Sequence, residues 1–168
     1  MLSRLALRTL LLCAAPMAHA DITVTFVEGA PKDQFIIATD EACALPPFSL
    51  TIDLTSSAAG LIFDVTDAGA GVEVFQPLTL TTGADQVTAL STLTDGDQYL
   101  SLDIASLTAN SPITFTTDLD DTIDQRAITV TGAEIAGATV RLTQMDGVIS
   151  ADFGATAAAS IPTTQCSG

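Results

Sequence analysis

The sequence predicts an all-β protein that folds as a single antiparallel β-sandwich of an Ig-like or jelly-roll-like kind. Apolar and polar residues alternate along short stretches that recur roughly every 8–12 residues, as in sandwiches. Threonine is abundant, and its β-branched side chain suits a pleated, half-buried surface. After residue 20, no stretch keeps the i, i+3, i+4, i+7 spacing of an amphipathic helix. An open barrel is the minor alternative.

The predicted strands follow from the alternation itself. Side chains that would face the core occupy every second position over residues 22–26, 48–54, 61–65, 100–104, 113–117, 140–142 and 149–153, and they are apolar except for Thr117. Asp146-Gly147 lies between the last two stretches and predicts a tight hairpin. Asp95-Gly96 is a weaker turn signal of the same kind.

The N-terminal 20 residues predict an export signal. Arg4 and Arg8 form a positive region, residues 5–15 are mostly apolar, and residues 18–20 (Ala-His-Ala) form a small-x-small cleavage site before Asp21. The apolar stretch is too short for a membrane anchor. We therefore expect cleavage after residue 20 and a mature protein that is exported, either periplasmic or extracellular.

The predicted mature chain, residues 21–168, has the length of one domain. Residues 154–168 are rich in alanine and threonine and predict an extended C-terminal tail. Cys43 and Cys166 are the cysteines that remain after cleavage, and an oxidising compartment favours a bridge between them. Loop-closure entropy would make that bridge worth up to about 5 kcal/mol. Two free thiols are the alternative.

Charge and composition exclude several functions. The mature chain would keep three basic residues (Lys32, Arg126 and Arg141) and all 20 acidic ones, a formal charge of −17, and no histidine. An acidic surface repels phosphate backbones and anionic lipid, so we expect no nucleic-acid partner and no membrane insertion. Without an imidazole, and without a nucleophile elbow or phosphate-binding loop, the sequence predicts no enzyme.

The acidic residues suggest a metal site. Asp118, Asp120 and Asp121 fall within four residues, directly after a predicted strand. In an unbroken strand, Asp118 and Asp120 would share the face opposite Phe115 and Thr117. Carboxylates this close repel one another unless a cation relieves them, and calcium prefers such hard oxygen ligands. The expected calcium ligands are Asp118, Asp120 and Asp121, helped by Glu28, Asp33, Asp64 and Asp67 from other turns. The alternative is that these acids occupy turns and keep the protein soluble.

Four segments resemble a known family: GAPKDQF (29–35), GLIFDVTDAGAGVEVFQP (60–77), DLDDT (118–122) and TGAEIAGATV (131–140). Together they are similar to the core domain of sponge aggregation factors and to its small secreted bacterial relatives, over about residues 22–140. The segment from residue 60 is the most specific. In sponges these domains build a ring that organises calcium-dependent cell adhesion. The resemblance implies an extracellular adhesion or self-association module.

Two other functions stay open at the level of sequence. A calcium-stabilised carbohydrate-binding module would need exposed aromatic side chains, and the mature chain offers one tyrosine and seven phenylalanines. A pilin-like periplasmic subunit would need an incomplete sandwich that a donor strand completes. We expect self-association first, with a cell-surface component or a glycan as the further partner.

Overall fold

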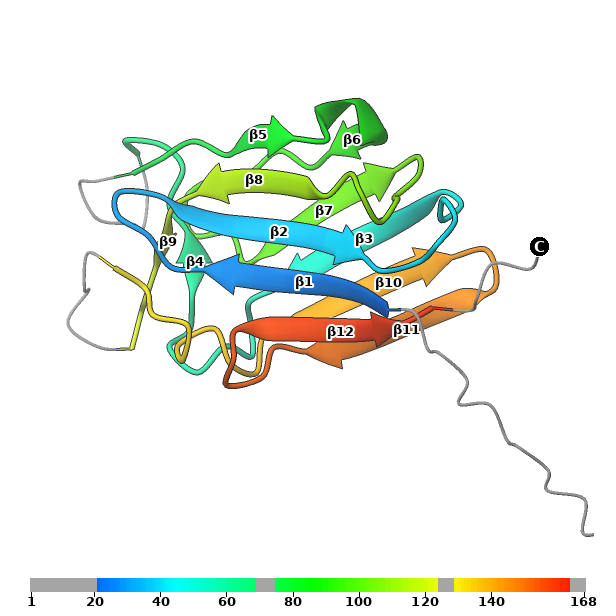
Figure 1. Ribbon diagram of the computed structural model, residues 1–168. Coiled ribbons are helices and arrows are strands. Elements are labelled where there is room, and N and C mark those ends of the chain that lie inside the picture. The colour runs from blue at the N-terminus through cyan, green and yellow to red at the C-terminus, as the bar shows by residue number, and fades with distance from the viewer. Residues whose placement is uncertain (1–20, 69–74, 124–128, 164–168) are drawn as a thin grey trace, which may run out of the picture.

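The structure is a computed structural model that describes residues 21–68, 75–123 and 129–163. The predicted signal peptide and Cys166 lie outside these residues. The described chain forms two five-stranded sheets packed face to face, so the predicted β-sandwich is confirmed (Figure 1). All strand pairs are antiparallel. No helix among the described residues is long and apolar enough to cross a membrane.

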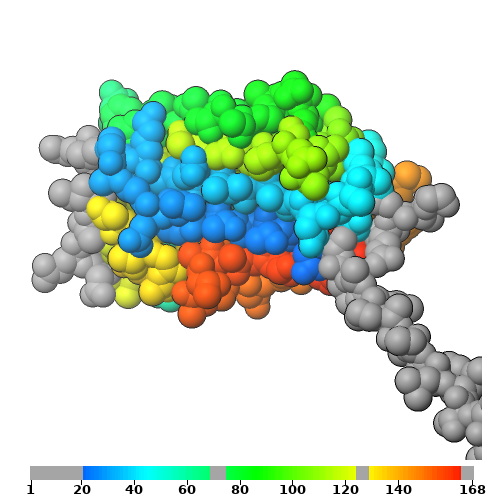
Figure 2. Space-filling view, viewed as in Figure 1, coloured from blue at the N-terminus to red at the C-terminus, as the bar shows by residue number. Residues whose placement is uncertain are grey.

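The first sheet has the order β12-β1-β2-β8-β5. Its strands are β12 (Ala158–Pro162), β1 (Asp21–Val27), β2 (Asp33–Thr39), β8 (Ile113–Thr117) and β5 (Thr79–Thr82). Figure 2 shows them as parallel bands across one face of the molecule, from β12 at the bottom to β5 at the top. The predicted tail is extended over residues 158–162, where it forms the edge strand β12 of this sheet.

The second sheet has the order β11-β10-β3-β7-β6. Its strands are β11 (Gly147–Asp152), β10 (Thr139–Gln144), β3 (Phe48–Asp53), β7 (Tyr99–Ile104) and β6 (Val87–Leu90). A single 3₁₀ turn, Ala84–Gln86, precedes β6. The hairpin predicted at Asp146-Gly147 is confirmed, because Gln144 pairs with Gly147 where β10 turns into β11.

The core lies between the sheets because each central strand buries every second side chain. In β1, Ile22, Val24 and Phe26 are buried, whereas the threonines between them are partly exposed. Phe35 is fully buried and stacks on Phe115 with ring centroids 5.1 Å apart. Burying a side chain of this size stabilises the fold by about 1.5–3 kcal/mol.

A short third ladder closes one end of the sandwich. Here β4 (Ile62–Phe63) pairs with β9 (Leu119–Asp120), with Ile62 opposite Asp120 and Phe63 opposite Leu119. In Figure 1 this ladder lies at the left end, where β1 ends and β2 begins. Chain segments from both sheets therefore meet at this end.

Candidate functional site

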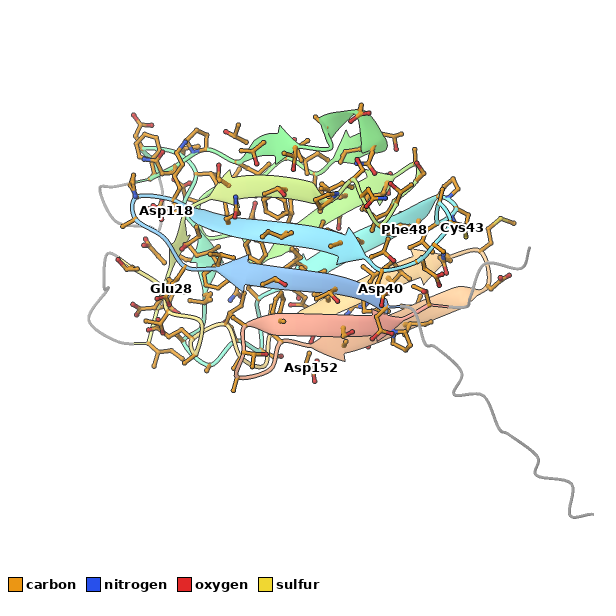
Figure 3. All side chains as sticks on the ribbon, viewed as in Figure 1. Glu28, Asp40, Cys43, Phe48, Asp118 and Asp152 are labelled. Carbon is orange, nitrogen blue, oxygen red and sulfur yellow. The ribbon has the colours of Figure 1, made fainter. Side chains whose placement is uncertain are left out.

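Five carboxylates are buried at the end of the sandwich that the β4–β9 ladder closes. The relative exposures are 1% for Asp33, 1% for Asp64, 7% for Asp118, 3% for Asp120 and 2% for Asp121. We call these five residues the acidic cluster. Asp33 begins β2, Asp64 follows β4, and Asp118, Asp120 and Asp121 lie in and around β9. Figure 3 labels Asp118 at this end of the molecule, near Glu28.

The chain reaches this arrangement because β8 stops at Thr117. The next residues leave the first sheet and pair with β4, and Asp64 N donates a hydrogen bond to the carbonyl oxygen of Asp118 (3.1 Å). Thr122 then fixes the segment, donating through Oγ1 to the carbonyl oxygen of Gly60 (2.7 Å). The sequence predicts that Asp118 and Asp120 lie on the strand face opposite Phe115 and Thr117, which assumes one unbroken strand. The break explains why all four side chains are buried instead.

Asp33 is held by two backbone donors. Its Oδ1 accepts a hydrogen bond from Gly29 N and its Oδ2 accepts one from Leu119 N, each at 3.2 Å. Burial, together with the charges of Glu28 and Asp120, raises the pKa of Asp33 to about 7 against the lowering effect of these two hydrogen bonds. At neutral pH this side chain is therefore divided between its neutral and charged forms.

The pKa of Asp118 is also raised to about 7. Burial is the largest cause, and the neighbouring charges of Asp120, Asp33 and Asp64 add to it, against a backbone hydrogen bond. Within the cluster, the charges of Asp120, Asp33 and Asp64 therefore oppose the ionisation of Asp118, and the charge of Asp120 opposes that of Asp33. A bound proton or a bound cation would relieve that repulsion.

Positive side chains are scarce around the cluster. Within the described residues, Lys32 and Arg141 carry the permanent positive charges. Lys32 is exposed in the turn before β2. Arg141 lies on β10 in the second sheet, with Nη2 3.8 Å from Oδ2 of Asp53. A salt bridge of that length on the surface is worth less than about 1 kcal/mol.

Two of the seven predicted ligands are exposed and lie outside the buried group. Glu28 accepts a hydrogen bond from Gly132 N through Oε2 (3.0 Å), although its charge still acts on Asp33. Asp67 lies in the loop after Val65. In the described part of the chain, no three His, Cys, Asp or Glu side chains are already arranged so that they could hold a metal ion.

Sequence reasoning missed the role of Asp95, which it treated only as part of a turn. Its Oδ1 accepts hydrogen bonds from Val65 N (2.8 Å) and Thr66 N (2.7 Å), and so fixes the segment that follows Asp64. Desolvation opposes ionisation of Asp95, but hydrogen bonds from Thr66 and Val65 outweigh it and lower the pKa. An Asp-Gly pair carries no sequence signal for such a long-range contact.

Cys43, one partner of the predicted cysteine bridge, lies at the other end of the sandwich, where Figure 3 labels it together with Asp40. Thr163, which follows β12, donates through Oγ1 to Oε1 of Glu41 (3.0 Å). The C-terminal segment therefore runs past the loop that contains Cys43, three residues before Cys166. The bridge itself stays a prediction, because Cys166 is outside the described residues.

The fold and the site define a small, acidic β-sandwich protein with a buried carboxylate cluster at one end. No protein-family model, curated protein or solved structure matches the chain.

Proposed function

We propose that this protein is an exported adhesion module that self-associates and binds calcium through its acidic cluster. The observation that carries the calcium proposal is the burial of five carboxylates at one end of the sandwich. The resemblance of four segments to aggregation factor cores supports the adhesion role and the extracellular location.

Calcium suits the donors that the cluster supplies. Its coordination shell takes six to eight oxygen ligands in flexible geometry, and carboxylates are its commonest protein ligands. The side chains of Asp33, Asp64, Asp118, Asp120 and Asp121 come from turns and strand ends, where small shifts of the backbone are less costly than in a central strand. Magnesium demands near-ideal octahedral geometry and sheds its waters reluctantly, so it fits this set less well.

Thermal unfolding in chelator, calcium and magnesium tests the proposal. Extracellular calcium modules bind at about 10⁻⁴ to 10⁻³ M. Calcium at about a hundred times the dissociation constant should then stabilise the fold by about 2.7 kcal/mol, and magnesium should do less. The double variant Asp120→Asn with Asp121→Asn should lose this calcium-dependent stabilisation, so calcium should no longer raise its melting temperature.

The matched control is Asp85→Asn with Asp146→Asn, which removes the same charge from two exposed positions. This control should keep the full calcium shift. Equal shifts from both metals would indicate general screening of the acidic surface. An unchanged shift in the Asp120 and Asp121 variant would show that calcium binds elsewhere.

The self-association part of the proposal has its own measurement. A strongly acidic chain repels its own copies, so association should strengthen with salt or divalent cations. Size-exclusion chromatography with light scattering, in calcium and in chelator, should show a larger species in calcium. A protein that stays monomeric at high concentration in both buffers would overturn this part.

A carbohydrate-binding module is the second candidate, because one exposed aromatic side chain lies beside charged residues on the outer face of the second sheet. Tyr99 is 53% exposed and pairs with Asp53 across β7 and β3. Arg141 contacts Asp53 from the next strand. An aromatic ring beside charged hydrogen-bonding groups is a typical sugar platform. Glycan-array binding that Tyr99→Ala abolishes would favour this function over the adhesion module.

A further inference from the structure

The two five-stranded sheets of the described chain have four edge strands, and three of these carry features that discourage pairing with another chain. The edge strands β5 and β6 have four residues each, and both show a register shift against their neighbours. The edge strand β12 ends at Pro162. Short length, irregular register and proline all protect sheet edges from association.

The fourth edge strand, β11, has none of these features. It has six residues, contains no proline, pairs with β10 in unbroken register, and is exposed at five of its positions. Val148 is 58% exposed and Ile149 is 42% exposed. The residues between Asp146 and Asp152 carry no charge. The chain is strongly acidic, so most of its surface repels a second copy. This uncharged, apolar edge can pair with another uncharged edge without that repulsion.

The hydrogen-bonding groups of β11 follow from its hairpin. The turn has two residues, so Gln144 and Gly147 form the closing hydrogen-bonded pair. Because the pattern alternates along an antiparallel ladder, Ile149 and Ala151 also bond to β10. The backbone N–H and C=O groups of Val148, Ser150 and Asp152 therefore point away from β10. An antiparallel strand with the same spacing would complement them.

We propose that β11 pairs with β11 of a second copy of this chain, antiparallel about a twofold axis at Ser150. This inference rests on the proposed self-association and names its surface. Val148 would face Asp152 of the second copy, and Ile149 would face Ala151. The β11-containing sheets of the two copies then form one continuous sheet across the axis, whereas the β12-containing sheets of the two copies do not pair.

Charge and packing favour this register over its neighbour. The neighbouring register has its twofold axis at Ile149, so that Ile149 of one copy faces Ile149 of the other. In that register Asp146 of one copy lies directly opposite Asp152 of the other, and like charges directly opposite each other are destabilising. In the proposed register, Asp152 of the second copy lies on the same sheet face as the exposed Arg141, which pairs with Ser150 across the β10–β11 ladder. Arg141 lies two strand spacings, about 9.6 Å, from the strand that carries this carboxylate, so its positive charge favours the approach of Asp152 without a direct ion pair.

The main test changes the backbone of β11 at the proposed axis. Ser150→Pro removes an outward N–H without removing a bond to β10, whereas Ser150→Ala keeps that donor. By sedimentation velocity in calcium, Ser150→Pro should raise the dissociation constant of the wild-type assembly at least tenfold. Ser150→Ala should leave it unchanged. Thermal unfolding of each variant checks that it is folded.

A second pair of variants keeps the inference testable if Ser150→Pro does not fold. Ile149→Lys places a charge in the pairing strand, and Leu90→Lys makes the same change on the edge strand β6. Only Ile149→Lys should weaken association, again at least tenfold. If the wild type associates but Ile149→Lys assembles as well as Leu90→Lys, the β11 interface is wrong and self-association stands. If the wild type is monomeric throughout, the proposed self-association fails as well.

Discussion

Asp64 and Asp118 lie opposite each other at the next position of the β4–β9 ladder, where Asp64 N donates to the carbonyl oxygen of Asp118 (3.1 Å). Both side chains are buried, and the charge of Asp64 contributes to the raised pKa of Asp118. Backbone pairing thus holds two carboxylates close together although their negative charges repel each other. The free energy of the backbone ladder and the core offsets that repulsion.

The raised pKa values predict that stability falls as the pH rises. Asp33 and Asp118 have folded-state pKa values of about 7, above the value of 3.8 for an unperturbed aspartate. Between these values the folded protein binds more protons than the unfolded chain, so the free energy of unfolding decreases with pH. Their contribution is fully present below about pH 4 and is lost as the pH passes 7.

Urea unfolding in chelator checks this dependence. The midpoint should be higher at pH 5 than at pH 8, and the difference should shrink in Asp33→Asn with Asp118→Asn. Calcium should reduce the difference as well, because it stabilises the ionised carboxylates. A protein that is equally stable or more stable at pH 8 without metal would contradict the raised pKa values.

Asp33 should also matter as a hydrogen-bond acceptor. Asp33→Ala leaves the backbone donors Gly29 N and Leu119 N without this partner, at a cost of about 1–3 kcal/mol for each donor that stays buried. At pH 5, where the aspartate is mostly neutral, we expect Asp33→Ala to destabilise the fold by about 2 kcal/mol or more. Asp33→Asn retains one oxygen and should cost less.

Chemical denaturation measures both variants. The control is Asp85→Ala, at an exposed position, which should change the free energy of unfolding by no more than about 0.5 kcal/mol. If Asp33→Ala behaves like that control, the two hydrogen bonds do not stabilise the turn between β1 and β2.

Gly137 should resist substitution because of both its backbone and its neighbour. Its φ is 88°, in the left-handed region, and a Cβ there would lie 2.6 Å from the carbonyl oxygen of Ser56. We expect Gly137→Ala to destabilise the fold by about 2–3 kcal/mol. Gly147→Ala also changes a glycine of positive φ, but its Cβ meets no atom within 4 Å.

The difference between these two glycine variants in thermal unfolding therefore reports the close approach to Ser56 together with the different backbone strain at φ 88° and φ 148°. Gly137→Ala should melt clearly below Gly147→Ala. Equal losses would mean that the backbone around Gly137 relaxes without cost.

A bridge between Cys43 and Cys166 is expected in the exported protein. Its intact mass should show removal of residues 1–20 and the loss of two hydrogens. Cys43→Ser with Cys166→Ser should then destabilise the mature protein by about 2–5 kcal/mol. Two thiols that alkylate without prior reduction would exclude the bridge.

The sequence predicted strands well where one face is apolar and the other polar, as in β1, β3 and β7. It missed β2, which lies in the middle of the first sheet. In β2, Asp33 occupies a buried position and Ile36 a partly exposed one, so the apolar alternation that marks a strand is obscured. The acid that hides the strand is also a member of the acidic cluster.

Local chemistry determined the class of this protein. The period of the apolar residues specifies half-buried strands, and the surplus of acids predicts candidate ligands and predicts no anionic partner. Tertiary structure alone decided which acids meet. Asp33 and Asp118 are far apart in the chain, and they share a site only because β2 pairs with β8 and β9 turns to pair with β4. Asp67 has the same chemistry but lies in an exposed loop, whereas Asp64 is buried although the alternation over residues 61–65 would put it on the face opposite the apolar side chains. Burial depends on contacts between distant segments, so it is set by strand pairing rather than by local sequence.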